Sequence, residues 1–162
     1  MFRHLFGLFL LSFLSLSVGC TSFALQRGDE FAKLGKWEQA LESYEEAHAG
    51  NPDSADSRAR VLEARKQVAR RSLEASRRLS AQQSWRDAFS KLEHARELSP
   101  DTIGIKQQAN AIHSGICKQA TERLQRHDFA GARKLAIEAI QFFPNHKVAP
   151  DLLKAIPQSI IR

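Results

Sequence analysis

Cysteine is scarce in this sequence, which contains only Cys20 and Cys117 among its 162 residues. If Cys20 is modified, as argued below, Cys117 has no partner, and a disulfide framework is excluded. Cys117 follows Ile116 within an apolar helical pattern. We therefore expect its side chain to be a small buried one rather than a reactive thiol.

The motifs on which many enzymes depend are also missing. The sequence has no glycine-rich phosphate loop and no Gly-x-Ser-x-Gly turn around a nucleophilic serine. No two histidines stand four residues apart, and no cysteine pair supports them as metal ligands. We therefore expect no enzymatic activity, no catalytic residue, no cofactor and no metal. The histidines are expected at surface or capping positions; they are His4, His48, His94, His113, His127 and His146.

The N-terminal apolar stretch is too short for a permanent membrane span. It runs from Leu5 to Val18, which is 14 residues, whereas a spanning helix needs about 20. The stretch follows a basic residue, Arg3, and small residues come after it. This order is typical of secretory signals. Residues 1–19 are therefore predicted to be a signal peptide.

The segment Ser17-Val18-Gly19-Cys20 resembles the lipobox of bacterial lipoproteins. It departs from the commonest form, because Leu16 stands one position earlier than the usual leucine and Ser17 takes its place. The resemblance implies that the Cys20 sulfur receives a diacylglycerol, that cleavage occurs just before Cys20, and that the new amine is acylated. Two or more acyl chains hold a protein stably on a membrane.

The residue after Cys20 bears on localisation. Thr21 stands there instead of aspartate, which in some of the lipoproteins that this segment resembles goes with sorting to the outer membrane. A lipid-anchored protein of the cell envelope, on the periplasmic side of the outer membrane, is therefore expected. The alternative is ordinary cleavage after Ser22-Phe23-Ala24, which would give a soluble periplasmic or secreted protein.

A five-point pattern occurs three times in the rest of the chain. An aromatic residue is followed by alanine after three residues, an apolar residue after seven, alanine after ten and proline after fifteen. The copies run from Trp37 to Pro52, from Trp85 to Pro100 and from Phe129 to Pro144. Small residues let two helices approach closely, and a proline ends the second helix. We expect the first alanine of each copy, Ala40, Ala88 and Ala132, to be buried where helices meet.

This pattern resembles the second half of the tetratricopeptide repeat (TPR). The resemblance implies an all-α fold over residues 20–162, arranged as a short right-handed array of helical hairpins. The first halves match less well, with Gly28 and Phe31 at the family's small and aromatic positions. The copies are also 48 and 44 residues apart, whereas a standard TPR repeats about every 34.

The extra length predicts elongated first helices in the second and third repeats, since few helix-breaking residues interrupt these segments. Asp53-Ser54, Ser84 and Asp101-Thr102 are expected N-caps. Helices are predicted over residues 22–34, 37–49, 54–79, 84–98, 102–126, 129–142 and 148–156.

Positive charge is concentrated in one part of the chain. The net charge is +6, and residues 57–91 alone contribute +7. An export signal argues against nucleic acid as the partner. On a helical wheel of residues 54–79, one half is apolar, and most basic residues, including Arg60, lie on the other half. The candidate partner-binding residues are Arg58, Arg65, Arg70, Arg71, Arg77 and Arg78.

Arg58 and Arg65 differ from the others because they lie inside the apolar arc of this wheel. One interpretation is that they pair with Glu42, Glu45 or Glu46. The other is that they line a groove and bind a partner's carboxylate.

Two functions are open at this stage. The first is a membrane-tethered, TPR-like adaptor that binds a peptide or helix of another envelope protein. The resemblance implies a role as an assembly factor for an outer-membrane complex. The second is a periplasmic structural protein whose basic face contacts the cell wall or anionic lipid.

Overall fold

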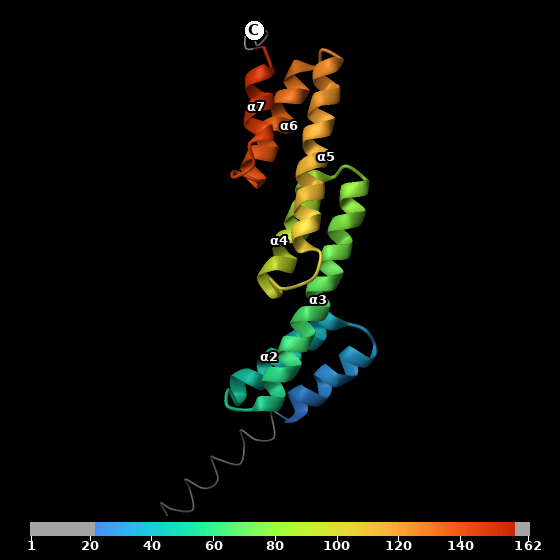
Figure 1. Cartoon of the computed structure of the whole chain (residues 1–162). Coiled ribbons are helices and arrows are strands. Elements are labelled where there is room, and N and C mark those ends of the chain that lie inside the picture. The colour runs from blue at the N-terminus through green and yellow to red at the C-terminus, as the bar shows by residue number, and fades with distance from the viewer. Residues whose placement is uncertain (1–21, 158–162) are drawn as a thin grey trace, which may run out of the picture. The chain divides into compact units, whose positions relative to one another are not determined.

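The computed structural model describes residues 22–157, and every regular element in that range is a helix. The predicted all-α fold class is therefore confirmed. The signal peptide and Cys20 lie outside the described residues. Among those that are described, no helix is both long enough and apolar enough to cross a membrane. A helix over residues 22–33 comes first, followed by α2 (Trp37–Gly50), α3 (Ala55–Ala81), α4 (Trp85–Leu98), α5 (Ile105–Gln125), α6 (Phe129–Phe142) and α7 (Val148–Ala155) (Figure 1).

Helix lengths follow the sequence pattern closely. The elongated helices expected before the second and third copies are α3, with 27 residues, and α5, with 21. The three helices that begin at the aromatic residues, α2, α4 and α6, each have 14 residues. A proline stands two residues after the end of each of these three helices, where it prevents the helix from continuing.

The chain divides into two compact units within α3, between Val68 and Ala69. The N-terminal unit is described over residues 22–68. Its core is formed by the helix over residues 22–33, α2 and the first part of α3. The buried apolar residues of this unit are Ala24, Ala40, Leu41, Tyr44, Ala47, Val61, Ala64 and Val68.

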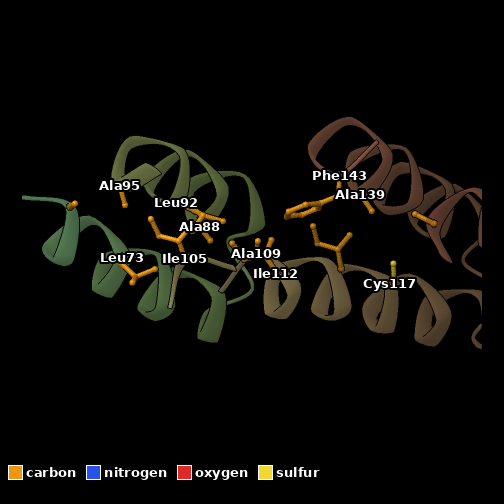
Figure 2. Packing of buried hydrophobic residues seen from close by; sticks show 13 residues of the cluster. Leu73, Ala88, Leu92, Ala95, Ile105, Ala109, Ile112, Cys117, Ala139 and Phe143 are labelled. Atoms are coloured by element: carbon orange, nitrogen blue, oxygen red, sulfur yellow. The ribbon is translucent and has the colours of Figure 1, made fainter. Parts of the chain in front are cut away.

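The C-terminal unit is described over residues 69–157, and α5 packs against α4, α6 and α7 within it. Figure 2 shows Leu73 of α3, Leu92 of α4 and Ile105 of α5 directed toward one another in its core. Further along α5, Phe143 lies over the same helix. Ile112 and Ile116 are fully buried, so α5 is the central helix of this unit.

The small residues of the repeat pattern are buried as predicted. Ala40, Ala88 and Ala132 each have 0% of their surface exposed. At Ala88 the approach is close enough for the Ser76 hydroxyl of α3 to donate a 2.6 Å hydrogen bond to the Ala88 carbonyl oxygen. A larger side chain at such a position would separate the helices.

The turn before each 14-residue helix has the same conformation three times. Gly35, Gln83 and His127 all have positive φ, between 59° and 70°. Each donates from its backbone N–H to the carbonyl oxygen three residues earlier, and the next residue donates to the carbonyl oxygen five residues earlier than itself. These two bonds define a Schellman motif, which ends a helix at a left-handed residue.

The predicted N-caps have mixed outcomes. Ser54 caps α3, because its hydroxyl accepts a 3.2 Å hydrogen bond from the Ser57 backbone N–H. Ser84 stands before α4 without a side-chain capping bond. The prediction of an N-cap at Asp101-Thr102 was wrong, because α5 begins later, after Gly104. The φ of Gly104 is 97°, a conformation that favours glycine. The sequence analysis missed Asp128, which caps α6 by accepting from the Gly131 N–H.

Candidate functional site

Arg60 has a structural position that the helical wheel did not predict. The wheel placed it on the solvated half of α3, but its side chain is only 34% exposed and pairs with another helix of the N-terminal unit. It pairs with Asp29 of the first described helix and, from Nε at 3.1 Å, with Asp56. Asp29 also accepts a 2.7 Å hydrogen bond from the Tyr44 hydroxyl of α2. Arg60 therefore joins three helices of this unit and is a packing residue.

The charge state of this cluster follows from its geometry. The pKa of Tyr44 is raised, first by burial and then by its hydrogen bond to the Asp29 carboxylate. Burial alone would lower the pKa of Arg60, but its bond to Asp56 and the nearby charge of Asp29 raise it overall. The tyrosine therefore stays a neutral donor and the arginine stays charged at neutral pH.

Arg65 pairs with a carboxylate of the same chain, which is the first of the two interpretations. Its Nε and Nη2 donate to Glu45 Oε1 at 3.2 and 2.6 Å, so it pairs with one of the predicted carboxylates. About half of its side chain remains exposed, as does that of Glu45. An ion pair with this exposure contributes on the order of 0–1 kcal/mol.

Arg58 differs from this prediction. Its Nη2 donates to the Pro52 carbonyl oxygen at 3.2 Å, and none of the three predicted carboxylates is its partner among the described residues. Arg58 is exposed. Its bond to the preceding turn arises because residue 58 lies one helical turn into α3, within reach of the turn that leads into it.

The other candidate arginines lie on α3 within the C-terminal unit. Arg70, Arg71, Arg77 and Arg78 are all exposed. Arg70 and Arg77 are seven residues apart and share a helix face. Glu74 is also exposed and lies four residues from both Arg70 and Arg78, where helical neighbours interact. Arg70, Arg77 and Arg78 therefore form an exposed row with Glu74 among them, named here the α3 basic row.

A groove between three helices was not found from the sequence. It has a volume of about 520 Å³ and is lined by the end of α4, the first half of α5 and the end of α6 with the turn that follows it. The sequence signal was the Phe142-Phe143-Pro144 run, which the repeat alignment used only as the end of a helix. The lining residues are Arg96, Ile105, Lys106, Ala109, Asn110, Phe142, Phe143, Pro144, Asn145 and His146.

A second, more polar pocket adjoins Trp85. It has a volume of about 330 Å³ and includes residues of α4, α5 and α6. The Trp85 indole donates from Nε1 to Gln119 Oε1 at 2.6 Å, and Gln119 donates to Gln83 at 2.8 Å. Arg86 and Glu138, which also line it, pair at 3.5 Å. The polar groups of this pocket thus largely satisfy one another.

His113 corrects the expectation that every histidine lies at the surface or at a cap. It is 6% exposed and its ring lies 4.2 Å, centroid to centroid, from that of His146. Its pKa is lowered, first by burial and then by the proximity of His146. One turn along α5, the Cys117 sulfur lies 3.6 Å from His113 Nε2.

The prediction for Cys117 is confirmed. Its side chain is buried, and burial raises the pKa of the thiol. A raised pKa keeps the sulfur protonated and a poor nucleophile at neutral pH. Over residues 22–157, no group of three His, Cys, Asp or Glu side chains is placed to hold a metal ion.

Comparison of the sequence with protein-family models and with curated proteins finds no match.

Proposed function

We propose that this protein is a membrane-anchored adaptor of the TPR-like type, which binds other proteins of the cell envelope. The observation that carries the proposal is the threefold recurrence of one local structure. Each recurrence has a Schellman turn, an aromatic residue at the first position of a 14-residue helix, and a fully buried alanine three residues later. The second alanine of each copy then accepts the last backbone bond of its helix.

Such recurrence supports a repeat scaffold. In a repeat array each unit packs on its neighbours through small residues, and the outward side chains are free to bind partners. The exposed α3 basic row offers charge to an acidic partner. The positive charge of this row would speed the association of an acidic partner, and added salt would weaken this effect by screening the attraction.

The packing of Ala24 supports the lipid anchor at Cys20 over the alternative cleavage site. Ala24 is 1% exposed and lies in the helix over residues 22–33. Cleavage after Ala24 would remove a buried residue from the core of the N-terminal unit. Cleavage before Cys20 would leave this helix whole, and the acyl chains attached to Cys20 would stand just ahead of it. A role as an assembly factor for an outer-membrane complex fits such a tether.

Capture from detergent-solubilised membranes tests the proposal. The full-length protein should retain a defined envelope protein, and the triple substitution of Arg70, Arg77 and Arg78 by alanine should lower that recovery severalfold at low salt. A matched triple variant replaces exposed lysines elsewhere, at Lys33, Lys36 and Lys91, and should bind as the parent does. Equal loss in both variants would mean that total charge, not the α3 basic row, governs binding.

The competing function predicts a different outcome of the capture experiment and a positive result in a vesicle-binding assay. A structural protein that uses its basic face on lipid would capture no specific protein. It would instead bind vesicles containing anionic phosphatidylglycerol, and binding would weaken steeply with salt. That result would replace the adaptor function with the lipid-binding one.

A further inference from the structure

The walls of the groove between α4, α5 and α6 are largely apolar. Ile105 and Ala109 form one side on α5, and Phe142 and Phe143 form the other. Phe142 is only half-buried, although its ring stacks on Phe89 with centroids 4.3 Å apart. The stacking fixes the orientation of a partly exposed aromatic surface. The groove is therefore a preformed apolar site held by the core beneath it.

The rim of this groove carries positive charge. Among its lining residues, all within the described part of the chain, Arg96 and Lys106 are cationic and none is acidic. Arg96 shares a 3.0 Å ion pair with Glu93 but remains about half exposed. Lys106 is exposed at the start of α5. The exposed ammonium of Lys106 is therefore available to a partner's carboxylate at this rim, while Arg96 already pairs with Glu93.

Exposed amides complete the rim. Asn110 and Asn145 line the groove and are both exposed. A side-chain amide can donate to and accept from the backbone of an extended peptide. Specific pockets generally combine apolar walls with a few placed polar groups, in volumes of about 300–1,000 Å³. The groove fits one or two side chains of a partner, not a whole folded domain.

We propose that this groove binds a short segment of a partner protein that carries a bulky apolar side chain next to a carboxylate. The apolar side chain lies against Phe142 and Ile105, and the carboxylate lies at the rim near Lys106. This inference rests on the proposed adaptor function and assigns it a site separate from the α3 basic row. The charge of the rim favours an acidic segment over a neutral or basic one.

Selection from a library of random peptides tests the proposal on the detergent-solubilised full-length protein. The peptides that are enriched should share a Phe, Trp, Leu or Ile residue beside Asp or Glu. One enriched peptide, synthesised with a fluorescent label, then serves as the probe for titrations. Replacing its apolar residue by serine should weaken binding at least about tenfold.

Variants locate the site on the protein. Asn110→Trp fills the groove from an exposed position and should abolish peptide binding, whereas Gln107→Trp, also exposed on α5, should not. Lys106→Glu should weaken binding at least about tenfold, and a probe with lysine in place of its carboxylate should recover it. Lys118→Glu, exposed on the same helix, is the charge-matched control.

Three results would overturn the inference. The first is a library that enriches no peptide, and the second is a set of enriched peptides that bind Asn110→Trp as tightly as the parent protein. The third is self-association in sedimentation that Asn110→Trp removes, which would make the occupant a second copy of the chain. Membrane capture that fails while the peptide binds in the groove would instead count against the adaptor function, so the two failures are distinguishable.

Discussion

The indole ring of Trp85 lies so close to Gly115 that a β-carbon at position 115 would be 2.4 Å from its Cη2 atom. Real β-carbons do not approach other atoms this closely, so the ring or α5 would have to move. The contact places the aromatic residue that begins α4 directly against the middle of α5. Trp85 is held there by its hydrogen bond to Gln119, one turn further along α5.

Gly115→Ala should therefore destabilise the protein. Alanine favours a helix over glycine by about 1 kcal/mol, but overpacking at a tight contact costs about 1–3 kcal/mol, so the net effect should be a lower melting temperature by circular dichroism. Gly50→Ala is the control, because Gly50 is exposed at the end of α2. Combining Gly115→Ala with Trp85→Leu should cost less than the sum of the two. An unchanged or higher melting temperature in Gly115→Ala would contradict the contact.

The three Schellman turns predict opposite effects of glycine and alanine. A residue with a side chain costs roughly 1–2 kcal/mol in the left-handed region. Glycine avoids this cost, but part of the gain is offset because glycine makes the unfolded chain more flexible. Gln83→Gly and His127→Gly should each raise the melting temperature slightly, and Gly35→Ala should lower it. Each change to glycine also removes one contact: Gln83→Gly loses the hydrogen bond from Gln119, and His127→Gly loses the edge contact of its ring with Phe129. Should all three changes act in the same direction, the shared conformation would be refuted.

The local parts of this fold were predictable because their signals are local. Trp85, Ala88 and Pro100 each fix one property of α4: its start, its close packing and its end. The spacing of the copies then gave the long helices α3 and α5, because the segments between them contain few helix-breaking residues. The turns at Gln83 and His127 could not be predicted from the sequence. A left-handed position favours glycine, and of the three turns only the first has one, at Gly35.

The sites were harder to predict because they depend on which helices come together. A helical wheel treats α3 as having one apolar side and cannot show that Asp29, 31 residues away, would come to meet Arg60. Leu62, an apolar residue of α3, is 54% exposed, which the wheel also could not show. The groove joins residues from Arg96 to His146 through ordinary core side chains. Its one sequence signal, the Phe142-Phe143-Pro144 run, also fits the end of a helix.

Acid should destabilise the C-terminal unit through His113. Because burial and His146 lower the pKa of His113 below its ordinary value of about 6.5, the unfolded chain takes up this proton first as the pH falls. The stabilisation is therefore complete above about pH 6.5 and is lost as the pH falls below that value toward the lowered pKa.

Melting temperatures measured from about pH 7.5 to about pH 5 test this expectation. His113→Gln should show a shallower fall over that interval than the parent, by a few degrees, even though its melting temperature at neutral pH is lower. His127→Gln, at an exposed position, should follow the parent curve. A His113→Gln curve parallel to that of the parent would assign the acid sensitivity to other groups.

Cys20→Ser should release the protein from membranes and leave the precursor uncut, since serine cannot form the thioether to diacylglycerol. Cys117→Ser is the matched control, because it removes the other cysteine and leaves Cys20 intact. Fractionation and immunoblotting measure both effects. A Cys20→Ser protein of normal mature size that stays with the membrane would rule out the lipid anchor.

Because Cys117 is buried, chemical labelling of its thiol can measure how often this part of the protein opens locally. In Cys20→Ser the thiol of Cys117 is the only one present, and it lies on the central helix with 7% of its surface exposed. A bulky thiol reagent can reach it only when α5 separates from its neighbours. When reclosing is faster than the labelling step, the rate of modification measures the free energy of that local opening. A partner that binds across α5 would therefore slow the labelling without touching the sulfur.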